Sequence, residues 1–104
     1  MTIQIPRPVR FVIFHKPGPK WKYGVDYREQ DGVDEHVQHY LKLHAQEKLQ
    51  LGGPFLLPDV GGMMVTTKGV SQSEIEAFAA ADPAVKSGLL VYEIRPWMTA
   101  MEHN

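Results

Sequence analysis

Short apolar runs and one long helical pattern alternate along this chain. The first run, Phe11–Phe14, is rich in β-formers and lies between prolines, so it predicts a strand over residues 9–15. From Gly32 to about Lys48, apolar residues recur at helical spacing opposite charged and amide residues, which predicts a helix lying on a sheet. The apolar positions of this helix are Val33, Val37, Tyr40, Leu41 and His44.

A hairpin-like unit is expected next. Residues 49–51 alternate as in a strand and run into Gly52-Gly53-Pro54-Phe55, which we interpret as a tight corner with exposed backbone. Because Pro54 has no N–H to donate to a ladder, this strand should lie at a sheet edge. Turn residues at 58–62 lead into a third strand over 63–67, paired back on the second.

A second helix and a last strand complete the pattern. Ser71 and Glu74 have capping-box spacing, which predicts a helix that begins there and runs to about Ala81. Asp82-Pro83 should end this helix, although Pro83 can open another short turn. The last strand is expected over residues 89–94, stopped by Pro96.

The resulting order, β-α-β-β-α-β, predicts a ferredoxin-like α+β fold with a four-stranded antiparallel sheet and two helices on one face. We expect the first and last strands to be central and the second to be an edge. Residues 11–14 and 89–92 are apolar at consecutive positions, so both sheet faces need cover, and two helices can cover only one. A second copy of the chain is the expected cover, which predicts a homodimer.

The composition of the chain narrows the class of protein and of partner. With 104 residues and 43% hydrophobic content, the chain should form one domain over residues 1–104 with its own core. Eleven basic against twelve acidic residues give a formal charge of −1, which disfavours nucleic acid as a partner.

Location is inferred from the cysteine count and the amino terminus. The absence of cysteine excludes disulfides and thiolate catalysis, and suits a reducing compartment, so we expect a cytoplasmic protein. Residues 1–10 hold Pro6 and Pro8, and the apolar run after them is too short for a signal peptide core or a membrane span, so no membrane partner is expected.

His36 is the first candidate for chemistry, because imidazole titrates near neutral pH and this residue borders the apolar stripe of its helix. Asp82 ends the second helix, which lies beside the first in this topology, so its carboxylate could orient the His36 ring and stabilise its protonated form. The alternative is structural: Asp82 caps local amides and His36 is an ordinary surface histidine.

A metal site on the first helix is not expected. His36 and His39 are three residues apart and His44 is near the next turn, but the spacing of a zinc protease and any cysteine ligand are missing. A solvated histidine-rich helix face explains the pattern better.

Two further segments could contact a ligand. The Gly52–Phe55 corner offers backbone amides and a ring, or is simply a tight turn, and is no phosphate loop because no Gly-Lys-Ser/Thr follows. The loop over residues 16–31 could cover a pocket, or its aromatic residues could pack the loop down. Its aromatic and basic residues, which could also bind an anionic aromatic compound, are Trp21, Tyr23, Tyr27, Lys20, Lys22 and Arg28. Met63 and Met64 are expected to fill strand core and interface.

Several of these residues occur in one known combination. They are His36 with Val37 and Tyr40, Lys48-Leu49 leading to Gly53-Pro54-Phe55, the run Ala79–Val85 with Asp82-Pro83, Gly88, and Arg95-Pro96-Trp97. In this combination the chain resembles the YCII-related (YciI-like) proteins over a core of about residues 9–98. It departs from them at Glu47, where a glycine commonly precedes the second strand, and we expect the turn to form there all the same.

The resemblance implies a ferredoxin-like domain that pairs into a dimeric α/β barrel. It also implies a His–Asp active-site pair at His36 and Asp82, with proton transfer on a small cyclic or aromatic molecule. The chemistry would be that of a lyase or isomerase, as in a relative that eliminates chloride from a chlorinated hydroquinone. Neither metal nor cofactor is expected. Candidate contacts with a small-molecule substrate are Trp21, Tyr40, Gly53, Pro54 and Phe55. The alternative function is a non-catalytic binding or accessory module.

Overall fold

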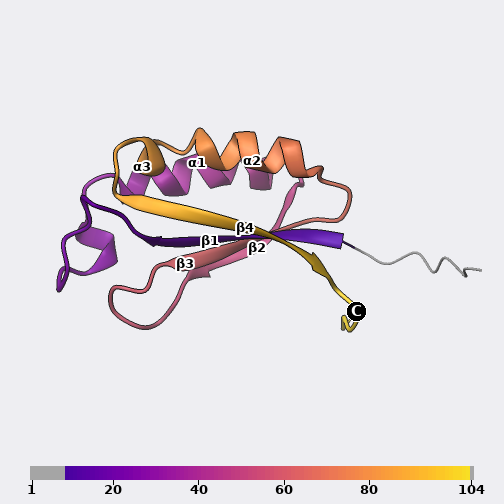
Figure 1. Ribbon diagram of the computed structural model, residues 1–104, viewed down its shortest axis with the longest axis horizontal. Coiled ribbons are helices and arrows are strands. Elements are labelled where there is room, and N and C mark those ends of the chain that lie inside the picture. The colour runs from indigo at the N-terminus through magenta and orange to yellow at the C-terminus, as the bar shows by residue number, and fades with distance from the viewer. Residues whose placement is uncertain (1–8, 104) are drawn as a thin grey trace, which may run out of the picture.

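The computed structural model describes residues 9–103, so the amino-terminal segment with Pro6 and Pro8 lies outside the described residues. The chain forms an α+β, ferredoxin-like fold with all helices on one face of the sheet, as predicted (Figure 1). The elements in order are β1 (Val9–Pro17), the 3-10 turn η1 (Tyr27–Glu29), α1 (Val33–Ala45), β2 (Leu49–Pro54), β3 (Gly62–Thr66), α2 (Gln72–Ala80), α3 (Pro83–Lys86) and β4 (Leu90–Met98).

The four strands are antiparallel in the order β2-β3-β1-β4. The expectation that the first and last strands are both central was therefore wrong. Within residues 9–103, β1 and β3 are central, while β4 is an edge strand paired to β1 alone. The prediction that β2 lies at the other edge, made from Pro54, is confirmed.

β4 does not stop at Pro96, as the sequence pattern predicted, but continues to Met98, with Pro96 opposite Phe11. The reason is its edge position. One side of an edge strand has no neighbouring strand. A proline whose nitrogen faces that side breaks no ladder hydrogen bond, because a backbone N–H there would have had no strand to donate to.

Helix α1 ends at Ala45, three residues before the predicted end. The Lys48 N–H donates to the Leu43 carbonyl at 3.1 Å and the Glu47 N–H to the His44 carbonyl at 2.9 Å, the two hydrogen bonds of a Schellman cap. Glu47 takes the left-handed conformation, with φ 61°, that glycine usually supplies here. The expected turn thus forms with a non-glycine residue.

Helix α2 begins as the capping signal predicted, since the Glu74 N–H donates to Ser71 Oγ at 3.2 Å. The Glu74 carboxylate pairs with Lys48, in the turn before β2, and so ties α2 to the α1–β2 connection. Pro83 opens the short helix α3, as the Asp82-Pro83 pair allowed.

Alternate residues of β1 face the helices. Phe11 and Ile13 join Tyr40, Leu43 and Ile75 in the main core cluster. The buried residues of α1 are His39, Tyr40 and Leu43, so the buried face is rotated from the predicted stripe. Two residues of that stripe, Val37 and Leu41, are 44% and 50% exposed.

In the described part of the chain, no helix lies over the other sheet face (Figure 1). Val12, which pairs with Val65, and Phe14 point to this side, since they alternate with the core residues of β1. Leu51, Val91 and Trp97 are 58%, 45% and 48% exposed. This open face is therefore partly apolar.

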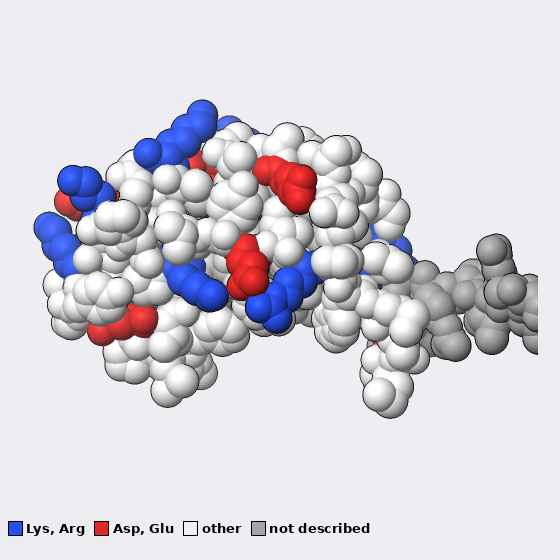
Figure 2. All heavy atoms as spheres, in the orientation of Figure 1, with Lys and Arg blue, Asp and Glu red and all other residues white. Residues whose placement is uncertain are grey.

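Charged side chains are interspersed by sign on the face that Figure 2 shows, with wide uncharged areas between them. Among the described residues, no helix has both the length and the apolar character needed to cross a bilayer.

Candidate functional site

Helix α1 and the α2–α3 junction bring His36 and Asp82 together. His36 Nδ1 lies 2.6 Å from Asp82 Oδ2, and Asp82 is fully buried. The second oxygen, Oδ1, accepts the Ala84 N–H at 2.9 Å and caps α3. The capping role and the contact with His36, which the sequence offered as alternatives, thus coexist on one carboxylate.

The electrostatics of Asp82 reflect this arrangement. Burial alone would raise the pKa of the carboxyl group, because desolvation penalises its charged form. The hydrogen bond and attraction from His36, with the Ala84 N–H, outweigh burial and hold the pKa below its ordinary value. Asp82 is therefore an anion beside an imidazole at neutral pH.

A second buried histidine, which the sequence analysis did not single out, completes the cluster. His15 is 2% exposed, and its Nε2 lies 3.2 Å from Tyr40 Oη and 3.9 Å from Asp82 Oδ2. Within residues 9–103, its Nδ1 has no hydrogen-bond partner. The available signal was position: His15 follows Phe11 and Ile13 on the inward face of β1, where a polar residue is unusual.

Burial also governs the charge state of the other two rings. It lowers the pKa of His15 to about 4, with repulsion from His36 adding to this effect and attraction to Asp82 opposing it. Burial, followed by the Asp82 carboxylate, raises the pKa of the Tyr40 hydroxyl. At neutral pH His15 is therefore an uncharged imidazole and Tyr40 keeps its proton.

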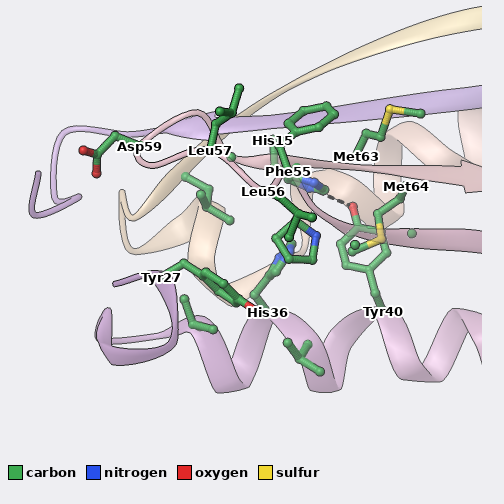
Figure 3. A pocket seen from close by; sticks show the side chains of 18 of the residues that line it. His15, Tyr27, His36, Tyr40, Phe55, Leu56, Leu57, Asp59, Met63 and Met64 are labelled. Atoms are coloured by element: carbon green, nitrogen blue, oxygen red, sulfur yellow. Dashed lines mark hydrogen bonds between the residues drawn. The ribbon is translucent and has the colours of Figure 1, made fainter. Parts of the chain in front are cut away.

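A cavity of about 970 Å³ opens between α1, the β2 edge and two loops (Figure 3). His36 and His15 line it, whereas Asp82 lies behind His36 and does not. All five predicted substrate contacts line it as well: Trp21, Tyr40, Gly53, Pro54 and Phe55. Val37 and Leu41, the exposed members of the α1 stripe, form part of its wall.

The sequence suggested that Gly52 and Gly53 form a tight corner, but the structure does not place them in one. They lie within β2, opposite Met64 and Met63, and the chain turns only after Pro54. The Phe55 N–H donates to the Gly61 carbonyl at 2.9 Å and closes the β2–β3 loop. Met64 packs against the main core cluster, as expected for a strand residue.

The loop after β1 is packed down and also lines the cavity. Trp21 is 8% exposed, and its Nε1–H donates to Asp59 Oδ1 at 2.8 Å, which joins this loop to the β2–β3 loop. Buried Gln30 bonds to the backbone of Lys22 and Val25.

The basic side chains of this loop do not form the anion site that the sequence left possible. Arg28 pairs with Asp26, and neither Lys20 nor Lys22 lines the cavity. Among the described residues, no Lys or Arg contributes to the cavity wall.

The helical histidines are not gathered around one point. His39 stacks on Phe78, with ring centroids 3.9 Å apart, and its Nε2 lies 2.7 Å from the Phe78 carbonyl oxygen. His44 is exposed. The groups that could reach one metal ion are instead His15, His36 and Asp82, whose ligand atoms lie within 4.8 Å of one another. An ion there would have to displace the hydrogen bond between His36 and Asp82.

Comparison with known proteins gives a family and a similar solved structure. The model of the YCII-related domain matches residues 9–98. A solved structure, 5-chloro-2-hydroxyhydroquinone dehydrochlorinase (TftG) from Burkholderia phenoliruptrix AC1100 in complex with 2,5-dihydroxybenzoquinone, is 27% identical, with a TM-score of 0.62. The match covers 85% of this chain and 92% of that one. No curated protein matches the sequence.

Proposed function

Since this chain belongs to the YCII-related domain family, we propose that it is a small enzyme that moves a proton on a cyclic or aromatic organic substrate. His36 is the acid–base group and Asp82 is its partner. The reaction is of the lyase or isomerase type, and the proton transfer itself requires no group beyond these side chains and the substrate.

The observation that best supports this proposal is the orientation of the His36 ring. Its Nδ1 faces Asp82 at 2.6 Å, and within residues 9–103 its Nε2 has no protein hydrogen-bond partner. His36 lines the cavity, so Nε2 is the nitrogen available to a substrate. When Nε2 takes a proton, the buried Asp82 carboxylate stabilises the imidazolium, which is the usual role of the acid in such pairs.

The cavity supports a ring-shaped substrate. Its wall is mainly apolar and includes aromatic side chains, and its volume of about 970 Å³ is ample for one ring. The similar dehydrochlorinase was solved with a dihydroxybenzoquinone bound, which supports a hydroxylated ring here. Trp21, Tyr40 and the segment Gly53–Phe55 are the proposed contacts.

The active form is a homodimer in this proposal. The open sheet face carries Leu51, Val91 and Trp97, each 45–58% exposed, and a second copy placed face to face would bury them. Pairing of this kind gives the dimeric α/β barrel of the family.

The test is turnover of chlorinated and unchlorinated hydroxyhydroquinones by the purified protein, followed by absorbance and by product analysis. The wild type should convert at least one of them, and His36→Gln should lower kcat by about 10²–10⁴-fold. His44→Gln is the matched control, because His44 is an exposed histidine of the same helix that also lines the cavity.

Two results would contradict the proposal. One is equal turnover by wild type and His36→Gln. The other is a compound that binds in the cavity and is recovered unaltered after long incubation, which would indicate a binding module in place of an enzyme.

A further inference from the structure

The site contains a second hydrogen-bonded pair, His15 and Tyr40, which the proton transfer between His36 and substrate does not use. Both side chains are 2% exposed, and both line the cavity. The rings of His15, His36 and Tyr40 form a compact triangle, with centroid distances of 4.7, 5.2 and 5.2 Å. Figure 3 shows the Tyr40 hydroxyl directed at His15.

The unpartnered nitrogen of His15 indicates which tautomer is present. Neutral imidazole carries one proton, and Nδ1 is the buried atom without a partner. A proton on Nδ1 would leave a buried N–H unbonded, which folded proteins rarely tolerate. The proton is therefore on Nε2, where it can donate to Tyr40 Oη at 3.2 Å and faces Asp82 Oδ2 at 3.9 Å.

This tautomer fixes what Tyr40 can do. If Oη accepts the hydrogen bond from His15, the hydroxyl proton of Tyr40 is not used by His15 and is free to donate elsewhere. Within residues 9–103, His15 Nε2 is the one hydrogen-bond partner found for Oη. The remaining acceptor within reach is whatever occupies the cavity.

We propose that Tyr40 donates a hydrogen bond to the substrate oxygen that gains negative charge during proton transfer, and that His15 is the positioning residue that orients the Tyr40 hydroxyl for this purpose. This inference rests on the proposed function and names a further part of its machinery. It makes the recognised group a phenol, enol or ketone oxygen.

Placement on α1 supports this role. Tyr40 follows His36 by one helical turn, so the two side chains lie on the same side of the helix and can contact one small ring. In the step itself, an O–H or C–H bond of the substrate breaks, its proton goes to His36 Nε2, and the electron pair moves to the substrate oxygen. Tyr40 only donates a hydrogen bond and keeps its proton.

The surrounding charges permit an anion at this point. The titratable groups near His15 are Asp82, His36 and His39 from the helices, with Tyr40 and Tyr92, the latter opposite His15 on β4. Once His36 is protonated, its charge balances that of Asp82, so the new oxyanion meets no net negative charge from this pair. The pKa of Tyr40 is raised by burial, so this hydroxyl stays a donor when the dyad is active.

The test uses 4-nitrophenol, whose phenol and phenolate forms absorb at different wavelengths, so its ionisation on the protein can be followed without turnover. The wild type should bind phenolate at least about tenfold more tightly than phenol, which lowers the apparent pKa of the bound probe. Tyr40→Phe should remove this preference. Tyr23→Phe, which changes a loop tyrosine that is 70% exposed and lies outside the cavity wall, should keep it.

His15 is tested by its coupling to Tyr40. His15→Leu should weaken phenolate preference, and His15→Leu with Tyr40→Phe should lose no more than Tyr40→Phe alone, because the two residues act as one unit. A merely structural effect of His15 would instead add to that of Tyr40. Circular dichroism of each variant checks that it is folded, and His15→Gln, which keeps an N–H donor, should restore part of the preference.

The proposal is overturned if the wild type binds neither form of the probe, if Tyr40→Phe retains the preference for phenolate, or if the two substitutions add. These results are separable from the proposed function. Phenolate preference without turnover of any ring compound would remove the enzyme assignment and leave the pair intact. Turnover that depends on His36 and not on Tyr40 would keep the enzyme assignment and remove the proposed role of the His15–Tyr40 pair.

Discussion

Asp82 divides its carboxylate between His36 and the start of α3, with Oδ2 2.6 Å from His36 Nδ1 and Oδ1 2.9 Å from the Ala84 nitrogen. The group that would stabilise a protonated His36 is thus held in place by the backbone of a helix. A fixed carboxylate of this kind costs no reorganisation when charge develops on the imidazole.

Asp82→Asn should destabilise the protein by about 1.5–3 kcal/mol at pH 7, because a buried, charge-assisted hydrogen bond is lost. The pKa of Asp82 is lower in the folded chain than its ordinary value of 3.8. Its contribution is therefore complete above pH 3.8 and is lost as the pH falls through the folded-state pKa. Urea unfolding from pH 7 to pH 2.5 should show this acid loss in the wild type and a smaller one in Asp82→Asn.

Asp31→Asn is the control for this experiment, because Asp31 is exposed and forms no hydrogen bond or ion pair with other described residues. It should unfold like the wild type at each pH. An Asp82→Asn profile parallel to that of the wild type would contradict the assigned contact.

His15 should lower the free energy of unfolding in a pH range different from that of Asp82. Its pKa is about 4 in the folded protein against 6.5 ordinarily, so the unfolded chain binds the proton first. The free energy of unfolding should therefore decline as the pH drops from about 6.5 to about 4, by on the order of 3 kcal/mol. His15→Phe should flatten this part of the curve, measured by urea unfolding.

His44→Gln provides the comparison, since His44 is exposed on α1 and its replacement should leave the slope nearly unchanged. If the wild-type protein were equally stable at pH 6.5 and pH 4, His15 would not be buried in neutral form.

The glycines around the β2–β3 turn should differ sharply in their tolerance of alanine. A Cβ at Gly62 would lie 2.5 Å from the Gly53 carbonyl oxygen and 2.9 Å from Pro54 Cα, both backbone atoms. Gly62→Ala should therefore cost at least about 2 kcal/mol in thermal or urea unfolding. At Gly53 a Cβ meets no atom of the described residues within 4 Å, so Gly53→Ala should stay within about 1 kcal/mol of the wild type. Equal effects would mean that β2 and β3 pair in another register.

A charge on the open sheet face should separate the proposed dimer. Leu51 is 58% exposed and pairs with Val65, so it lies on that face, in the edge strand β2. Leu51→Glu would bury an unpaired carboxylate between two sheets, which costs several kcal/mol, so light scattering should find a monomer at micromolar concentration. Leu56→Glu, at a loop residue that is 97% exposed, should leave the wild-type dimer intact. A monomeric wild type would refute the pairing.

Local signals in the sequence predicted the elements well, because they depend on a few neighbouring residues. The Ser71 cap and the Asp82-Pro83 break are of this kind. The predicted topology placed the two helices side by side and so offered His36 and Asp82 as candidates, and the family resemblance implied the same pair. Errors arose where an element's environment decided the outcome. Pro96 stops a central strand but is tolerated in β4, and the order of strands is not a local property.

His15 shows the limit most clearly. As a sequence feature it is one histidine at the end of an apolar strand, and its role depends on β1, α1 and the α2–α3 junction meeting at one point. Hydrophobic periodicity and capping determined the helices, the strands and the βαββαβ order, because these follow from short-range preferences and from burial of apolar faces. Packing between distant segments decided the strand order, the cavity, and the neutral imidazole beside Tyr40, since desolvation and hydrogen bonding across the core exist only once the chain has folded.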